Sequence, residues 1–220
     1  MAGPRPGGPT ALPPTPVLGV PLPFEDDADS MGPQTMSFPA IGRPTDPDDD
    51  RQTIGVVLEI PEPWASYLQA SREGFGDPQA RSIPTHVTLL PPTAVPRDQV
   101  DEVIAHLQAV AGRLAPFDLQ LEGTDTFRPV SPVVFVRVAR GGEGCDDAQR
   151  AVRTGPLARE LTFPFHPHVT VAHHLDDDAL DRAAKELAEF SAGFLVASFV
   201  LYEHGVDGVW RPRRLFRFGG

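Results

Sequence analysis

Two short segments of the chain carry the same pattern of histidine and threonine. Residues 84–90 read PTHVTLL and residues 166–172 read HPHVTVA, so the tripeptide His-Val-Thr occurs twice, 82 positions apart. Alternate side chains of a β-strand point to the same face, so each copy would present a histidine and a threonine on one face and two apolar side chains on the other. If both strands border one cleft, a small ligand there would be surrounded by His86, Thr88, His168 and Thr170.

Two imidazoles and two hydroxyls suit a displacement at phosphorus. Histidine has an ordinary pKa of about 6.5, so near neutral pH one ring of a pair can be neutral while the other is protonated. An in-line attack needs both forms, because the incoming oxygen loses a proton while the departing oxygen gains one. The threonine hydroxyls can hydrogen-bond the non-bridging phosphate oxygens, and no metal ion is needed. The residues leave open which histidine is the acid and which is the base.

The hydrophobic pattern places each His-Val-Thr copy within a similar series of elements. In the first half we expect strands at 54–60, 86–90 (closed by Pro91 and Pro92) and 117–123, and helices at 64–76 and 97–115. In the second half we expect strands at 132–139, 168–175, 193–204 and 210–218, and helices at 145–160 (broken near Gly155 and Pro156) and 176–190. The repeated order predicts a bilobal α+β fold, with two similar lobes at about 51–127 and 128–220. Each lobe would have a mostly antiparallel sheet backed by helices, with a central cleft between the lobes.

The first 50 residues have a different composition from the rest of the chain. They hold twelve of the 26 prolines and eight acidic residues against Arg5 and Arg43, a net charge of −6. Hydrophobic periodicity is absent there, so the segment cannot bury enough apolar surface to offset the entropy of ordering it. We therefore expect residues 1–50 to be a disordered, proline-rich acidic tail.

Composition also argues against several classes of protein. The formal net charge of −11 argues against wrapping a long nucleic acid, which requires many lysines and arginines. A run of about 18 apolar residues and a secretory leader are both lacking, so we expect a cytoplasmic protein with no membrane partner. Cys145 is the single cysteine, which excludes an intramolecular disulfide and fits a reducing compartment. A basic stretch near the C-terminus is either a solvated strand face or a rim that attracts phosphate: Arg211, Arg213, Arg214 and Arg217.

The two motifs and their surroundings resemble a known family. The segments HVTL (86–89) and HVTV (168–171), with TFRPVSPVVFVRV before the second and FHPHVTVAHH around it, are similar to the 2H phosphoesterase superfamily and more closely to its 2'-5' RNA ligase branch. The resemblance spans about residues 53–218. It implies a bilobal fold with a central cleft and hydrolysis of 2',3'-cyclic phosphates or other 2'-linked phosphodiesters. It also implies that His86 and His168 are the catalytic acid and base and that Thr88 and Thr170 bind phosphate. Many relatives have an arginine soon after the second motif, where this chain has His173.

Other residues are weaker candidates. We expect Arg128 and Tyr202 to contact the substrate, whereas Phe127 and Phe165 could either stack on a base or pack in the core. Four histidines close together could suggest a metal, but the interposed Pro167 and the lack of nearby carboxylates or further cysteines argue against one: His166, His168, His173 and His174. We expect no metal and no cofactor.

The residues and the resemblance together predict a metal-independent phosphodiesterase that works by two-histidine acid–base catalysis. Its partner would be a small nucleotide or an RNA end carrying a 2',3'-cyclic phosphate, and the protein would be a monomer. Two alternatives remain open: a non-catalytic module that binds RNA ends or nucleotides, and an enzyme that joins RNA ends through 2'-5' linkages.

Overall fold

The structure is a computed structural model that describes residues 50–161 and 163–219. The chain divides into two units, Met1–Thr35 and Met36–Gly220, and every described residue belongs to the second. The predicted tail, apart from Asp50, therefore lies outside the described residues.

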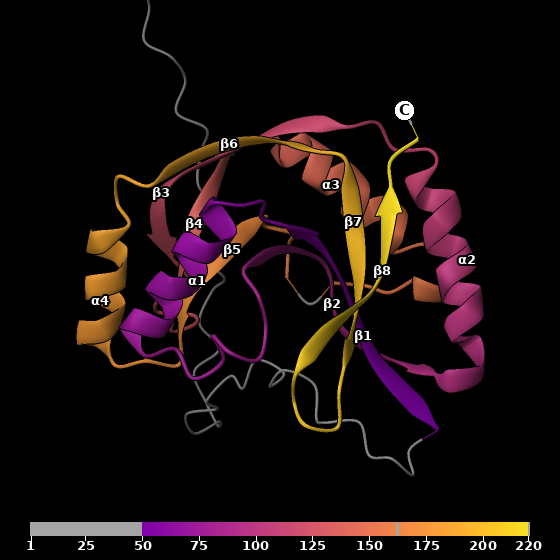
Figure 1. The fold of residues 1–220 in the computed structure, drawn as a ribbon, viewed down its shortest axis with the longest axis horizontal. Coiled ribbons are helices and arrows are strands. Elements are labelled where there is room, and N and C mark those ends of the chain that lie inside the picture. Colours follow the sequence, from indigo (N-terminus) through magenta and orange to yellow (C-terminus); the bar gives the residue numbers. More distant parts are fainter. Residues whose placement is uncertain (1–49, 162, 220) are drawn as a thin grey trace, which may run out of the picture. The chain divides into compact units, whose positions relative to one another are not determined.

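One antiparallel sheet of eight strands runs through the described residues (Figure 1). The strands are β1 (Arg51–Glu59), β2 (His86–Pro96), β3 (Phe117–Thr126), β4 (Val133–Arg140), β5 (His168–His173), β6 (Ser191–Val196), β7 (Ser198–His204) and β8 (Trp210–Arg217). Their order across the sheet is β6-β3-β4-β5-β2-β1-β7-β8, and all neighbours are antiparallel. The two strands that carry the His-Val-Thr copies, β2 and β5, are thus central neighbours.

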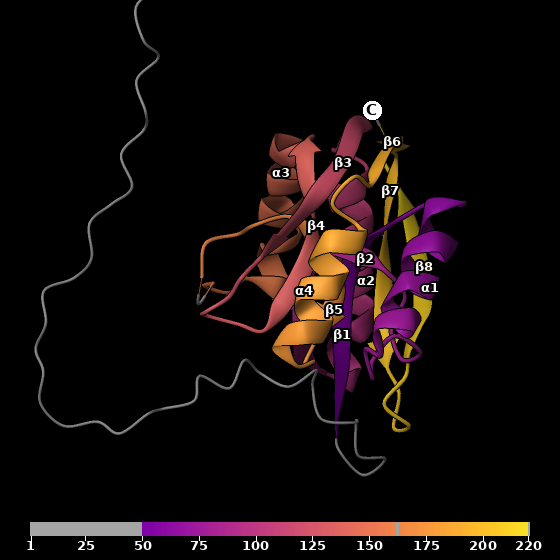
Figure 2. The ribbon, with the colours of Figure 1, turned by 90° about the vertical axis from the view of Figure 1, so that its left-hand side faces the viewer.

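The helices pack in two pairs. They are α1 (Trp64–Phe75), α2 (Val100–Ala111), α3 (Gly142–Val152) and α4 (Asp177–Glu186), with short 3-10 turns η1 (Arg97–Gln99) and η2 (Gly155–Leu157). Helix α1 contacts α4 and β5, and α4 also contacts β3 and β4, whereas α3 contacts α2 and β2, and α2 also contacts β8 (Figures 1 and 2). The helix between β1 and β2 therefore packs on β5, and the helix between β4 and β5 packs on β2. This exchange ties the two halves of the sheet together.

Local signals set the helix ends. The Asp176 side chain accepts a hydrogen bond from the Ala179 N–H, and two further acids in the first turn of α4 favour its positive N-terminal end. Helix α1 ends at Gly76, whose φ of 89° is in the left-handed region that glycine adopts without strain.

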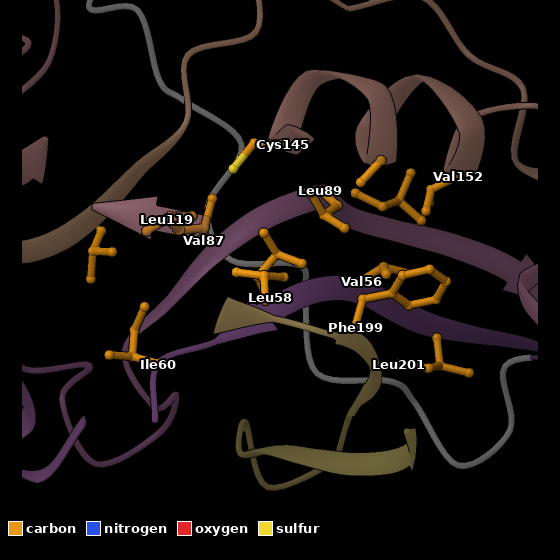
Figure 3. Packing of buried hydrophobic residues seen from close by; sticks show 14 of the residues in the cluster. Val56, Leu58, Ile60, Val87, Leu89, Leu119, Cys145, Val152, Phe199 and Leu201 are labelled. Carbon is orange, nitrogen blue, oxygen red and sulfur yellow. The ribbon is translucent and has the colours of Figure 1, made fainter. Parts of the chain in front are cut away.

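Alternation of side chains along β2 gives the strand one apolar face and one polar face. Val87 and Leu89 are fully buried in the main core, which Figure 3 shows beside Cys145 and Val152 of α3. The intervening residues, His86 and Thr88, point to the other face and are half-buried. A small second cluster lies on that other face and consists of Val57, Val200, Tyr202 and Trp210, with Ile83 against it. The main core thus holds the sheet and helices together without using the polar pairs.

The α+β class and the antiparallel pairing are confirmed, but the pairing of strands differs from two separate sheets. Strands β2 and β5 pair through Val87 and Val169, so the sheet is continuous. The strand pairs also cross the expected division near residue 127, because β3 pairs with β4 and β6, and β7 pairs with β1. Element order predicts the strands themselves, whereas partners so distant in sequence depend on how the whole sheet curls.

Two strand boundaries are corrected. The expected strand 193–204 is two strands separated by Ala197, one pairing with β3 and the other with β1, although Figure 1 shows them as a nearly continuous ribbon. Strand β2 also continues past Pro91 and Pro92 to Pro96. These two prolines lie opposite Gly55, where the register with β1 shifts, and a bulge tolerates residues that have no N–H to donate.

Candidate active site

The pairing of β2 with β5 brings the two motifs together. Val87 stands opposite Val169, so the same antiparallel register places His86 opposite Thr170 and Thr88 opposite His168. All four polar side chains then lie on the face of the sheet opposite the main core. Directly opposite and diagonal residues of an antiparallel pair are close enough for long side chains to reach one ligand.

The two histidines are held in the same way. Nδ1 of His86 donates to the carbonyl of Pro84 at 2.7 Å, and Nδ1 of His168 donates to the carbonyl of His166, also at 2.7 Å. A carbonyl can only accept, so Nδ1 carries the hydrogen and Nε2 of a neutral ring is left with its lone pair. In His86 this Nε2 lies 3.1 Å from the hydroxyl of Thr88, which can donate to it. Both rings therefore offer Nε2 for proton transfer.

Burial keeps both rings neutral in the ligand-free protein. Burial, together with the smaller effects of the positive charges of Arg72 and His168, lowers the pKa of His86 to about 4, although the hydrogen bond to Pro84 acts in the opposite direction. Burial also lowers the pKa of His168, with a smaller contribution from His166. A negatively charged ligand would raise both pKa values, because an anion stabilises the imidazolium. The site can thus take up a proton when an anion enters.

Two adjacent pockets open on this face. The histidine pocket has a volume of about 170 Å³ and is lined by Arg72, Gln79, Ile83, His86, Thr88, Pro92, Thr170, His173 and Trp210. The apolar pocket shares His86, Thr88, Ile83, Pro92 and Trp210 with it and is otherwise lined by Gly55, Val57, Pro84, Leu90 and Tyr202. One histidine and both threonines of the motifs therefore line the histidine pocket, whereas His168 lines neither of these two pockets. A site shared by all four residues stays a prediction.

His168 lies on β5, two residues before Thr170. Its ring meets those of Phe127 and Phe135 at centroid distances of 4.9 and 5.1 Å, and the Phe127 contact is edge-to-face. Phe127 thus packs beside a motif histidine rather than standing free to stack on a base, and Phe165 packs against the main core.

The two remaining candidates for substrate contact, Tyr202 and Arg128, differ in whether they line a pocket. Tyr202 lines the apolar pocket, and its hydroxyl donates to Oε1 of Glu59 at 2.6 Å. Arg128 is committed elsewhere: its guanidinium contacts Asp177 at 3.2 Å and Asp181 at 2.6 Å, both on α4, and it lines neither pocket. In the structure the acids of α4 therefore pair with the charge of Arg128, and the expected phosphate contact from this residue stays a prediction.

Arg72 and His173 line the histidine pocket but were not predicted from the sequence as substrate contacts. Arg72, with 3% of its surface exposed, forms a buried ion pair with Asp77. Its position carried a signal, because it stands four residues after Leu68 and three before Phe75, on the buried face of α1. His173 stacks on His174 at a centroid distance of 3.7 Å, and burial, followed by the charge of His174, lowers its pKa to about 4.

The neighbouring histidines do not form a metal site within the described part of the chain, where no three His, Cys, Asp or Glu side chains converge. The rings of His166 and His168 are 6.0 Å apart, and His173 and His174 form a separate stack. In the same described residues, none of the helices has the length and apolar character needed to cross a membrane.

Curated proteins of two bacteria match about three quarters of this chain. A protein of Halalkalibacterium halodurans is 29% identical over 167 residues, which are 75% of this chain and 96% of the relative. A protein of Bacillus cytotoxicus is 30% identical over 170 residues, 76% of this chain and 96% of the relative. Both carry a provisional name as phosphoesterases.

Solved structures show the same fold at low sequence identity. Ligand-free LigT of E. coli has a TM-score of 0.55 and 18% identity, with 78% of this chain and all of LigT covered. LigT complexed with 3'-AMP has a TM-score of 0.52 and 18% identity, with 77% of this chain and 99% of LigT covered. The model of the 2'-5' RNA ligase superfamily matches residues 60–208, which include both motifs. The chain therefore belongs to the 2'-5' RNA ligase superfamily of 2H phosphoesterases.

Proposed function

We propose that this protein is a metal-independent phosphodiesterase that opens a 2',3'-cyclic phosphate, or a related 2'-linked ester, on a small nucleotide or an RNA end. The observation that carries the proposal is the pairing of β2 with β5, which sets two His-Thr pairs side by side with each Nε2 available. The phosphoesterase names of the relatives and the complexes of LigT with 3'-AMP and with phosphate also support it. Both pairs come from one chain, so we propose that a monomer, acting in the cytoplasm, is sufficient.

The reaction would use the two imidazoles on opposite sides of the phosphorus. One neutral Nε2 removes a proton from water as its oxygen forms a bond to phosphorus, and the other, protonated Nε2 gives its proton to the ribose oxygen as the P–O ester bond breaks. Thr88 and Thr170 would donate to the non-bridging oxygens and orient the phosphodiester for in-line attack. The products are a phosphomonoester and a free ribose hydroxyl. Which ribose oxygen leaves determines which histidine acts as the base.

The test is hydrolysis of 2',3'-cyclic AMP in the presence of a chelator. We expect turnover by the unchanged chain and a loss of about 10²–10⁴-fold in kcat for His86→Ala and for His168→Ala, as is typical when a general acid or base is removed. His106→Gln is the matched control, because His106 bonds the carbonyl of Val152 between α2 and α3 and should keep normal turnover. Near-normal turnover in both alanine variants, or a requirement for added metal, would refute the proposal.

The same assay separates the two alternatives. A binding module would bind 3'-AMP or the cyclic nucleotide without forming product. An end-joining enzyme would convert RNA fragments with cyclic-phosphate and 5'-hydroxyl ends into longer products.

A further inference from the structure

Arg72 gives the histidine pocket a fixed positive charge. It is the one permanently charged side chain among the described residues that line this pocket. His86 and His173, which line the same pocket, both have a pKa lowered to about 4, so neither supplies positive charge near neutral pH. Asp77, the counter-ion of Arg72, is fully covered and does not line the pocket. The pocket thus presents a cation whose charge does not depend on pH.

The guanidinium is held in a fixed orientation. Nε and one terminal nitrogen donate to Oδ2 of Asp77 at 3.1 and 2.9 Å, and the other terminal nitrogen donates to the carbonyl of Ile83 at 3.0 Å. An arginine has five N–H groups, so these three bonds leave two without a partner among residues 50–161 and 163–219. The carbonyl of Pro84, next to Ile83, accepts from His86, so one short segment positions both the guanidinium and an imidazole.

Stability alone does not account for such a pair. Removing two charges from water has a large desolvation cost, and well-packed apolar residues are often as stable or more so at such positions. A preoriented guanidinium is, by contrast, well matched to phosphate oxygens, because its N–H groups form a planar fork. An ion pair in a pocket wall beside two threonine hydroxyls is therefore better explained by a ligand than by packing.

We propose that Arg72, oriented by Asp77, binds the phosphate group of the ligand in the histidine pocket through its two remaining N–H groups. This inference rests on the proposed function for the identity of the substrate, but not for the binding of an anion. Arg72 would hold the anionic phosphodiester while both imidazoles are still neutral, and would stabilise the additional negative charge that develops on the non-bridging oxygens during attack. Asp77 is a positioning residue in this arrangement.

The first test is the binding of inorganic phosphate, measured by calorimetric titration of the full chain at about pH 8, where the histidines are neutral. Arg72→Gln alone would leave Asp77 buried without its counter-ion, so the informative variant is the double substitution Arg72→Gln with Asp77→Asn, which removes both charges and keeps a polar amide at each position. Arg72→Lys keeps the charge without the fork. Arg150→Gln is the matched control, because Arg150 pairs with Asp146 and Asp147 on the exposed surface of α3.

We expect the unchanged chain and Arg150→Gln to bind phosphate equally. The double variant should bind at least about tenfold more weakly, with Arg72→Lys intermediate, and should show the same circular dichroism spectrum as the unchanged chain. The KM for 2',3'-cyclic AMP should rise more steeply with pH, between about pH 6 and 8, in the double variant than in the unchanged chain, because binding in the variant would depend on protonated histidine alone. A purely structural role would not produce that pH dependence.

Two results would overturn the inference: failure of the unchanged chain to bind phosphate, or equal binding by the folded double variant. If the double variant does not fold, equal binding by Arg72→Lys and the unchanged chain would overturn it as well. Arg72-dependent phosphate binding without any hydrolysis of cyclic nucleotides would instead refute the proposed function and leave the anion site standing. Normal hydrolysis by the double variant would refute the inference and leave the proposed function standing.

Discussion

The two imidazoles have the same hydrogen bond at Nδ1 but different surroundings. His86 has the Thr88 hydroxyl at its Nε2 and lines a pocket that also contains Arg72, whereas His168 packs edge-on against Phe127. Equivalent positions in the two motifs therefore do not imply equal proton affinities. The pH dependence of the reaction reports on this difference.

The lowered pKa values of His86 and His168 predict an acidic optimum for kcat/KM. The proposed mechanism needs one protonated ring, and in the free protein this form becomes scarce as the pH rises above the lowered pKa values. We expect kcat/KM for 2',3'-cyclic AMP to be highest below about pH 6.5 and to fall as the pH rises. The optimum of kcat should lie at higher pH, because the bound anion raises both pKa values. A kcat/KM that increases steadily from about pH 6 to 8 would contradict this account.

The threonines should affect catalysis through their hydroxyls. Thr88→Val and Thr170→Val keep the side-chain shape and remove the hydrogen-bond donor. We therefore expect each to lower kcat/KM by roughly 10- to 100-fold, which corresponds to about 1–3 kcal/mol of activation free energy for a hydrogen bond to a charged group. Thr88→Ser and Thr170→Ser should retain most of the activity. Equal losses in the serine and valine variants would show that the methyl group, and not the hydroxyl, is important.

At this scale the motif residues could be predicted from the sequence, whereas the cations could not. Recurrence of His-Val-Thr in strands is a local pattern and indicates which side chains share a face. The roles of Arg72 and Arg128 depend on which acids lie near them in space: Asp77 follows α1 directly, but the partners of Arg128 are about 50 positions away on α4. Arg128 stands in the segment TFRPVSPVVFVRV and Arg72 does not, so sequence context pointed to Arg128 and gave no reason to consider Arg72.

Neighbouring residues on a single strand, β2, face different parts of the molecule. Thr88 faces the histidine pocket, and Leu89 is 1% exposed in the main core. The strand alternation that was read from the sequence is what produces this division.

This division predicts opposite effects for adjacent substitutions. Leu89→Ala should lower the free energy of unfolding by about 2–5 kcal/mol, because it leaves a cavity in the core, and should keep activity within about threefold while the protein is folded. Thr88→Val should change the free energy of unfolding by less than about 1 kcal/mol. Urea denaturation and steady-state kinetics on both variants provide the check. A large loss of activity in folded Leu89→Ala, with little change in stability, would mean that the two faces are not independent.

The elements themselves could largely be predicted, because periodicity and caps are local, but their ends at bulges could not. Pro91 and Pro92 are strand breakers by themselves, and only the register shift opposite Gly55 makes room for them. The apolar run at 193–204 likewise has no strong breaker, and it divides at Ala197 because its two parts have different partner strands.

At the scale of the whole molecule, the lining of the pockets depends on how distant strands pair and not only on the repeated order of elements. Strands β7 and β8 belong to the second half of the sequence but join the sheet beside β1, from the first half. Tyr202 and Trp210 therefore line the apolar pocket next to His86. The element order could be predicted as a repeat, but this return could not, because it depends on contacts between segments more than 140 residues apart.

The buried neutral histidines predict a loss of stability in mild acid. The unfolded chain has histidine pKa values of about 6.5, whereas those of His86 and His173 are about 4 in the folded protein. Above about pH 6.5 both states are unprotonated and these groups have no effect. As the pH falls from about 6.5 to 4, the unfolded state alone binds the protons, so the free energy of unfolding decreases.

His173→Gln isolates this effect from that of the carboxylates. We expect the loss of unfolding free energy between about pH 6.5 and 4 to be smaller in this variant by roughly 1 kcal/mol, allowing for screening at a half-buried group. Thermal unfolding at several pH values measures it. An identical pH dependence in the variant and the unchanged chain would show that His173 has an ordinary pKa in the folded state.

The most direct test of the central claim is a double-mutant cycle on the two histidines, using hydrolysis of 2',3'-cyclic AMP with chelator present. If both imidazoles transfer protons in one step at one phosphorus, His86→Ala and His168→Ala should each lower kcat by about 10²–10⁴-fold, and the double variant should be little slower than the slower single variant. Losses that multiply in the double variant, or a single variant with normal kcat, would contradict a shared step.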